Sequence, residues 1–139
     1  MDDLVQFLRA RLDEDELIAR DASVGAWTKA EAPSIFVMSA NGLVAETSAF
    51  TDARHIARHD PARVLAEVDA KRQILDVHAS EDTGDPFDGC RTCSWRDYMD
   101  VLHVRWPCPT LRLMLTPYSD HPDYRAEWAI QPPDPDDES

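Results

Sequence analysis

Residues 76–114, DVHASEDTGDPFDGCRTCSWRDYMDVLHVRWPCPTLRLM, contain every cysteine of the chain. Cys90 and Cys93 have the CxxC spacing of a zinc knuckle, in which the two-residue gap lets a tight turn point both sulfurs at one ion. Cys108 lies between two prolines, where a helix is expected to begin and where free backbone N–H groups stabilise a thiolate. This stretch predicts a metal site that fixes the C-terminal half of the fold.

A histidine is expected to complete the metal shell. His78 ends a predicted helix shortly before the CxxC pair, and the intervening loop can bring its imidazole to the sulfurs. His103 is the alternative fourth ligand, but the inward helical position favours His78. The predicted shell of a closed, tetrahedral Cys₃His zinc site is His78, Cys90, Cys93 and Cys108.

Two other interpretations of the cysteines stay open. A redox pair uses the same CxxC spacing as a metal knuckle. Alternatively, Cys93 and Cys108 are small buried residues, and His78 is a hydrogen-bonded histidine at a helix end. A cytoplasmic protein with three cysteines more often binds metal than forms disulfides, which favours zinc.

Catalysis by this metal is not expected. Zinc nucleobase deaminases carry an HxE or CxE motif followed by PCxxC, whereas here Glu81 is one position too far from the histidine and Gly89 precedes the CxxC. The HExxH motif of metalloproteases is also missing, because His55 and His59 have no glutamate after the first histidine. A closed structural site is therefore the favoured interpretation.

Helical periodicity is clearest over residues 61–78, PARVLAEVDAKRQILDVH, which predict a long central helix. Asp60 and Pro61 predict its N-cap and first residue. An amphipathic helix is expected over residues 3–20. Thr51 is expected to cap a short helix that precedes Asp60. A last helical segment is expected from Cys108 or Pro109 to Pro117, followed by one or two helical turns before Trp128.

The segment between the first two helices predicts a small antiparallel sheet. Residues 35–38 and 43–45 are apolar and flank Asn41-Gly42, a pair that tolerates the positive φ angles of a type I′ hairpin turn. Residues 24–28 are a candidate third strand, which would help because an isolated hairpin is marginal. The expected fold class is α+β, with an N-terminal helix, a small sheet, a central long helix and a zinc-bound helical C-terminal segment.

Length and charge limit the possible functions. The 139 residues predict one domain over 1–130 with the zinc site in 78–108, and residues 131–139 predict a disordered acidic tail. The net charge of −13 disfavours direct binding to nucleic acid and to anionic membranes, and favours a basic partner. No apolar run reaches membrane-spanning length and the N-terminus is unlike a signal peptide, so the cytoplasm is the expected location.

Several stretches resemble a known family. The chain over 52–78, the CxxC pair and PCPTLRL are similar to a family of small uncharacterised proteins from actinomycetes, mainly Streptomyces, and their phages, catalogued as a domain of unknown function. The likeness extends from MDDLVQFLRARLDEDE to Trp128 and implies no activity. It implies that the family pattern includes His59, Asp60, Pro61, Cys90, Cys93 and Cys108.

The leading hypothesis is a zinc-stabilised interaction or regulatory protein that is not an enzyme and has an unidentified protein partner. One alternative is an acidic nucleic-acid mimic that occupies a basic site on a host protein. A second is a small hydrolase or transferase that uses His55, His59 and Asp60 beside a pocket.

Overall fold

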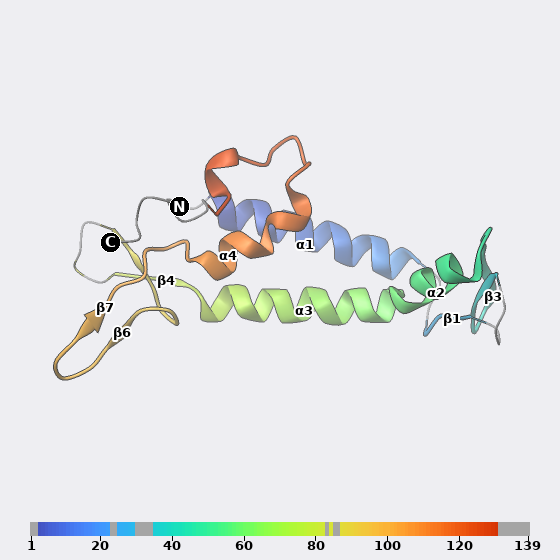
Figure 1. Cartoon of the computed structure of the whole chain (residues 1–139), viewed down its shortest axis with the longest axis horizontal. Coiled ribbons are helices and arrows are strands. Elements are labelled where there is room, and N and C mark those ends of the chain that lie inside the picture. Colours follow the sequence, from blue (N-terminus) through green and yellow to red (C-terminus); the bar gives the residue numbers. More distant parts are fainter. Residues whose placement is uncertain (1–2, 23–24, 30–34, 83, 85–86, 131–139) are drawn as a thin grey trace. The chain divides into compact units, whose positions relative to one another are not determined.

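The computed structural model describes residues 3–22, 25–29, 35–82, 84 and 87–130, which form helices and small antiparallel strand pairs (Figure 1). The α+β fold class is thereby confirmed. The chain divides into two compact units, with residues 1–10 and 72–139 in unit 1 and residues 11–71 in unit 2. A single domain over residues 1–130 stays a prediction, and the acidic tail lies outside the described residues.

Two long helices each contribute to both units. Helix α1, Asp3–Asp21, begins in unit 1 and ends in unit 2, whereas α3, Pro61–Val77, begins in unit 2 and ends in unit 1. Both helices form where the sequence predicts them, although Leu17 and Ile18 near the end of α1 are exposed. Their buried apolar residues include Leu4, Leu8 and Leu75 in unit 1, and Leu12 and Val68 in unit 2.

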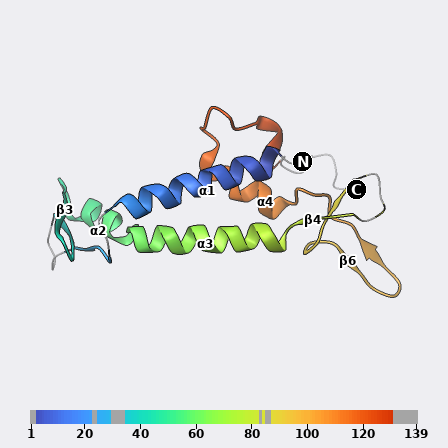
Figure 2. The same ribbon diagram turned by 180° about the vertical axis from the view of Figure 1, so that it is seen from behind.

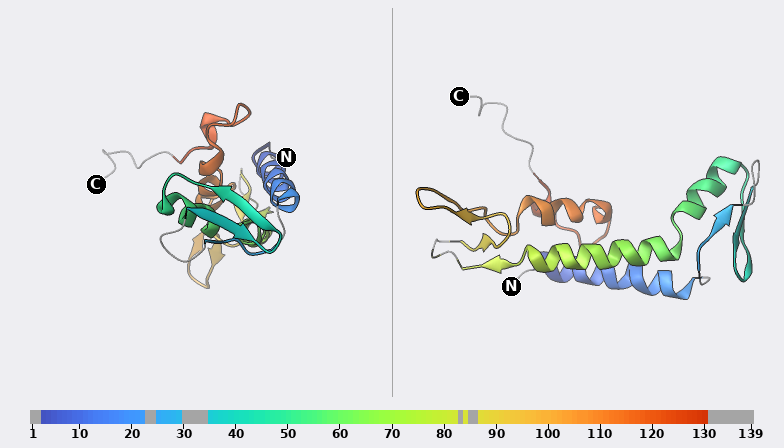
Figure 3. Two further views of the ribbon diagram at one scale, coloured as in Figure 1. Left: turned by 90° about the vertical axis from the view of Figure 1, so that its right-hand side faces the viewer. Right: turned by 90° about the horizontal axis from the view of Figure 1, so that it is seen from below.

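Unit 2 contains a three-stranded antiparallel sheet in the order β1-β2-β3, with β1 Thr28–Lys29, β2 Phe36–Ser39 and β3 Gly42–Glu46. Helix α2, Phe50–Arg58, packs on β1 and β2 (Figure 3). The hairpin is confirmed, and a third strand does pair with it, but this strand is Thr28–Lys29 and residues 25–27 of the predicted strand are not in the sheet. Ala53 of α2 and Val37 of β2 are both fully buried, so they form the centre of this small core.

Two local predictions in unit 2 are wrong. The hairpin turn is formed by residues 40–41, since Ser39 pairs with Gly42, and Asn41 keeps a negative φ, so the turn is not type I′. Gly42 takes the positive φ of 118°, which a residue without a Cβ adopts readily. Helix α2 begins before Thr51, because Ala49 is its N-cap and makes no side-chain capping bond.

Asp60 joins the sheet region to α3. One carboxylate oxygen accepts the Arg63 backbone N–H at 2.8 Å, and the other accepts the Trp27 backbone N–H at 3.1 Å. Pro61 occupies the first helical position, where a missing N–H costs nothing. The predicted cap is confirmed, and it also ties the segment before β1 to the start of α3.

Unit 1 packs the start of α1 against the C-terminal helices. Helix α4, Pro109–Met114, is followed by the 3₁₀ helices η1, Thr116–Tyr118, and η2, Ala126–Trp128, and this segment returns to the beginning of α1 (Figure 2). The Phe7 ring lies 5.1 Å from the Trp128 ring and 6.2 Å from the Tyr124 ring, centroid to centroid. The predicted helical C-terminal segment is confirmed, although α4 ends at Met114 and Pro117 lies in the 3₁₀ helix η1.

Two short strand pairs complete unit 1. Strand β4, Ser80–Glu81, pairs antiparallel with β5, Gly89–Cys90. Strand β6, Trp95–Arg96, pairs antiparallel with β7, Val101–Leu102, and forms a hairpin that the sequence analysis did not predict.

Replacing Asp60 by alanine should lower the free energy of unfolding by about 1–2 kcal/mol, because the N-cap bond to α3 and the bond to the Trp27 N–H are both lost. Urea unfolding followed by far-ultraviolet circular dichroism measures this change. Asp60→Asn keeps one acceptor oxygen for the helix and should lose less. Equal stability of Asp60→Ala and the wild type would contradict the capping role.

Candidate metal centre

His78 is held at the end of α3 by bonds on both sides of its peptide. Its backbone N–H donates to the Ile74 carbonyl at 3.0 Å, which continues the helical pattern beyond Val77. Its own carbonyl accepts the indole N–H of Trp106 at 2.8 Å. The backbone of His78 is therefore fixed between α3 and the segment that leads to α4.

The CxxC pair reaches His78 through strand pairing. Ser80 of β4 pairs with Cys90 of β5, so the chain returns to the helix end within a few residues of His78. The Cys90 N–H donates to the Val104 carbonyl at 2.8 Å, and the Arg91 N–H donates to the Ala79 carbonyl at 3.0 Å. A tight turn then follows, closed by the Ser94 N–H on the Cys90 carbonyl at 2.9 Å.

Cys108 is the N-cap residue of α4, which begins at Pro109 as the sequence predicts. Its carbonyl accepts the Arg112 N–H at 3.2 Å. Its side chain is fully buried, as is that of Cys90, whereas Cys93 and His78 are half-buried. Two segments of unit 1 thus deliver the three sulfur atoms, and the end of α3 delivers the His78 imidazole.

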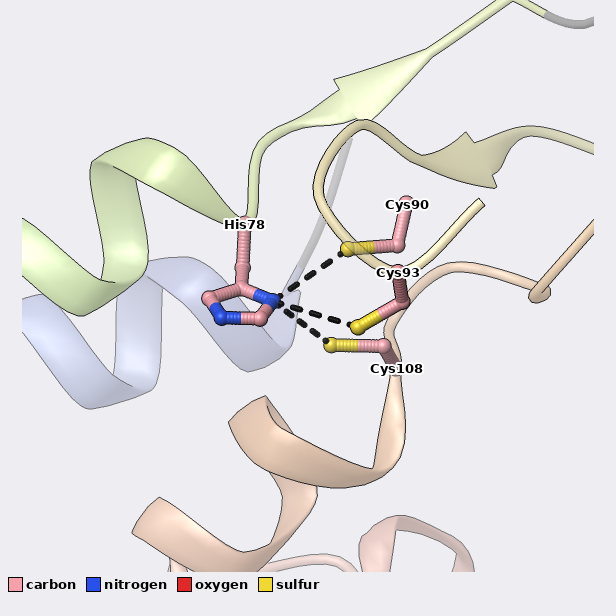
Figure 4. Close-up of side chains that lie close together, drawn as sticks. All are labelled: His78, Cys90, Cys93 and Cys108. Carbon is pink, nitrogen blue, oxygen red and sulfur yellow. Dashed lines mark hydrogen bonds between the residues drawn. The ribbon is translucent and has the colours of Figure 1, made fainter. Parts of the chain in front are cut away.

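The four side chains converge on a single point (Figure 4). The Sγ atoms of Cys90, Cys93 and Cys108 each lie 3.4 Å from Nδ1 of His78. A neutral imidazole nitrogen offers one lone pair, so it can accept one good hydrogen bond and not three. Three sulfurs at equal distances from one nitrogen are instead expected when all four atoms surround a common ion.

The chemistry of the donors fits a metal ion. All three cysteines are free thiols, and thiolate and imidazole are donors that soft or borderline metals prefer. Burial, followed by the hydrogen bonds to Cys90 and Cys108, raises the pKa of the Cys93 thiol to about 12. Burial therefore opposes a thiolate at this position, and a cation would supply compensating positive charge. His78, Cys90, Cys93 and Cys108 are close together and could bind a metal ion.

His103, the alternative fourth ligand, lies elsewhere in unit 1. It lines an open cavity of about 410 Å³ beside the β6–β7 hairpin, together with Glu81, Asp82, Ser94, Trp95 and Arg96. The structure therefore brings His78, and not His103, to the three sulfurs. His78 is brought to the sulfurs because it directly follows α3, and its side chain points toward the cysteines of the β5 turn and of the start of α4 (Figure 4).

His55 and His59 do lie together, as the hydrolase alternative requires. Their ring centroids are 4.4 Å apart, and His59 Nδ1 is 2.9 Å from the His55 carbonyl oxygen. Asp60, however, uses both carboxylate oxygens to accept backbone N–H groups. Its observed role is in the fold, so this alternative has no supporting contact from the aspartate.

Two supporting residues were missed by the sequence analysis. Trp106 anchors the backbone of His78 through its indole, and Ser94 bridges the base of the β6–β7 hairpin. Neither residue belongs to a recognisable motif. The hairpin itself had a weak signal, since Asp97 and Asp100 are turn-forming residues on either side of two large side chains.

The fold and the cluster define a small α+β protein with a Cys₃His group. The chain belongs to a family of unknown function (DUF6221), whose family model matches residues 1–130. The resemblance noted in the sequence is confirmed at the level of the family, while its range in actinomycetes and phages stays a prediction. Searches of curated proteins and of solved structures gave no match. Within the described residues, every helix is too short or too polar to cross a membrane.

Replacing His78 by alanine should accelerate loss of bound metal by about 100-fold or more, because even residues that only orient a ligand contribute about 10–100-fold to affinity. The matched control is His103→Ala, which should retain metal like the wild type because His103 lies outside the cluster. Elemental mass spectrometry after a timed challenge with a chelator measures the retained metal. Equal loss from both variants would contradict this assignment of the fourth ligand.

Proposed function

We propose that the cluster is a structural zinc site and that the chain is a zinc-stabilised protein-interaction module with no catalytic role for the metal. The observation that supports the proposal is the attachment of an exposed apolar hairpin, β6–β7, directly to the cluster.

Zinc fits the distances between the donor atoms. Tetrahedral zinc has Zn–S bonds of about 2.3 Å and Zn–N bonds of about 2.0–2.1 Å, which separate sulfur from nitrogen by roughly 3.5 Å. The three observed separations from His78 Nδ1 are 3.4 Å. Four protein ligands fill the tetrahedron and leave no position for water or substrate, which is the mark of a structural site. Such sites bind with an apparent ~10–16 kcal/mol, comparable to the stability of a whole domain.

Zinc affinity should fall as the pH is lowered. The Cys93 thiol has a pKa raised to about 12, so it carries its proton at neutral pH in the metal-free protein and must release it on binding. Protons therefore compete with zinc, and binding strengthens as the pH rises from about 6 to 8. Competition with a chromophoric chelator at several pH values measures the trend. An affinity independent of pH over this range would contradict thiolate coordination.

The hairpin is built onto the metal knuckle at its base. The Ser94 hydroxyl accepts the Val104 N–H at 2.9 Å, and the Val104 carbonyl accepts the Cys90 N–H at 2.8 Å. Its strands have two residues each, too few for an isolated hairpin to be stable in water. The cluster therefore fixes the hairpin, and loss of metal should release it.

The end of the hairpin presents apolar side chains to solvent. The exposed fraction is 97% for Tyr98 and 89% for Met99, and Trp95, Val101 and Leu102 are also exposed. Asp97 and Asp100 close the turn between them. Contiguous exposed apolar residues of this kind mark interaction sites, and tyrosine, tryptophan and methionine are enriched in interfaces. The net charge of −13 favours a partner whose apolar pocket has a basic rim.

The nucleic-acid mimic has less support. It requires rows of free carboxylates, and the acidic block of α1, residues 13–16, is partly neutralised. Arg11 pairs with Glu14 at 2.8 Å, and Arg20 pairs with Glu16 at 2.7 Å. These ion pairs stabilise α1 itself, so the acidic residues have an observed role in the helix and fewer carboxylates are left to bind a partner.

A photocrosslinking phenylalanine derivative placed at residue 98 should capture a defined partner in cells. The same derivative at Ile130, which is 42% exposed outside the hairpin, is the matched control and should not capture it. Combination with Cys93→Ser should abolish the adduct, because the hairpin loses its anchor along with the zinc. Denaturing gels and mass spectrometry identify the adducts.

Three outcomes distinguish the parts of this proposal. An adduct that forms equally from residues 98 and 130 contradicts the hairpin as the interaction site. An adduct that survives Cys93→Ser contradicts the dependence on metal. Full thermal stability of Cys93→Ser with an unchanged zinc content contradicts the structural zinc site itself.

A further inference from the structure

A second feature, in unit 2, lies on the solvent side of α2. An open cavity of about 530 Å³ is lined by Thr51, Arg54, His55 and Arg58. Their spacing of three, four and seven residues puts them on one helix face. The opposite face carries Ala53, which is fully buried. Helix α2 packs on β1 and β2 (Figure 3). The side of α2 that does not pack on the sheet is therefore cationic, in a chain with a net charge of −13.

The arginines of this face differ from those on the neighbouring helices. Arg11 and Arg20 on α1 and Arg63 on α3 each form an ion pair with a glutamate on their own helix. In the described part of the chain, neither Arg54 nor Arg58 forms an ion pair. Both side chains are exposed, so their guanidinium groups are available to an outside anion.

Every residue that lines the cavity can donate hydrogen bonds. Two guanidinium groups, a hydroxyl and an imidazole are present, and no carboxylate is among the lining residues. The ring of His59 lies 4.4 Å from the ring of His55, centroid to centroid, and is itself held at the His55 carbonyl. The His55 ring thus contacts the His59 ring while His55 lines the cavity.

We propose that this cationic face binds a diphosphate group, either free or carried by a small molecule. Arginine guanidinium matches phosphate oxygens with two parallel hydrogen bonds, and residues four apart on a helix can approach one anion together. The cavity is within the range of about 300–1,000 Å³ that small-molecule sites occupy. A diphosphate offers oxygens to both arginines, whereas a single phosphate is expected to engage them less fully.

The acidic charge of the chain does not prevent binding. Charges farther than about 8 Å are largely screened at physiological ionic strength, so the local donors dominate. The nearest acidic neighbour in sequence, Asp52, lies roughly 100° around the helix from Thr51, on the edge of this face. The proposal does not depend on the metal centre, which is built from residues of unit 1.

Isothermal titration calorimetry of pyrophosphate into the full, metal-loaded chain tests the site. Binding with one site per chain is expected for the wild type. The double substitution Arg54→Gln with Arg58→Gln should weaken it by about tenfold or more, since each bond to a charged group is worth at least about that factor. The matched control, Arg20→Gln with Arg63→Gln, removes the same charge from paired arginines and should bind within about twofold of the wild type.

Further titrations identify what the site recognises. Inorganic phosphate should bind more weakly than pyrophosphate. Equal binding of adenosine diphosphate and pyrophosphate would mean that the phosphates alone are recognised, and tighter binding of the nucleotide would mean that the ligand is an ester. Arg54→Lys with Arg58→Lys keeps the charge but loses the paired hydrogen bonds, so an intermediate affinity is expected. This variant tests the site even if the glutamine variant fails to fold.

Two results would overturn the proposal. One is the absence of pyrophosphate binding by the wild type at low ionic strength. The other is an equal loss of binding in the Arg54/Arg58 and the Arg20/Arg63 variants, because it would show that overall charge, and not this face of α2, attracts the anion.

Discussion

The convergence of three cysteine sulfurs on one imidazole nitrogen constrains unit 1 more than any other interaction. Cys90, Cys93 and Cys108 come from the β5 turn and from the start of α4, and His78 comes from the end of α3. Burial opposes thiolates at this point unless a cation compensates them, as the raised pKa of Cys93 indicates. Three thiolates and a neutral imidazole on a divalent cation would leave a single negative charge.

That constraint explains how little regular structure unit 1 needs. Its strands have two residues each, and α4 has six. Elements of this length contribute few backbone hydrogen bonds and little buried area, so they depend on cross-links or on contacts with longer elements. A metal ion held by the cluster would supply such a cross-link, and the Phe7 and Trp128 contact supplies an apolar anchor on the first helix. A hairpin with exposed Tyr98 and Met99 can then be held without a core of its own.

Unit 2 is organised by different forces. Its sheet is covered by α2 through Ala53 and Val37, and Asp60 links α3 to the segment before β1 by two hydrogen bonds. Charge is also distributed differently from what the total suggests. Ion pairs within α1 and α3 neutralise several arginines, whereas α2 concentrates Arg54 and Arg58 beside a cavity. A net charge describes the long-range field of the molecule, but only the pairing of individual side chains reveals a local site of the opposite sign.

The sequence alone determined the features that depend on local chemistry. The CxxC spacing and the helix start at Pro109 indicated the three sulfur donors. The Asp60-Pro61 pair indicated the start of α3. Both predictions succeeded because tight turns and helix caps depend only on neighbouring residues. Local rules failed where neighbouring structure intervened. Thr51 lies inside α2, and the hairpin turn precedes Gly42 because the register of β2 and β3 sets it.

Only the tertiary structure decided which histidine meets the sulfurs. His78 and His103 were both within reach along the chain, and the choice depends on strand pairing between β4 and β5 and on the Trp106 bond to the His78 carbonyl. The same holds for the β6–β7 hairpin and for the unpaired arginines of α2. The hairpin is defined by pairing between β6 and β7. The arginines are defined by the absence of an ion-pair partner among the described residues. A local sequence pattern encodes neither of these properties.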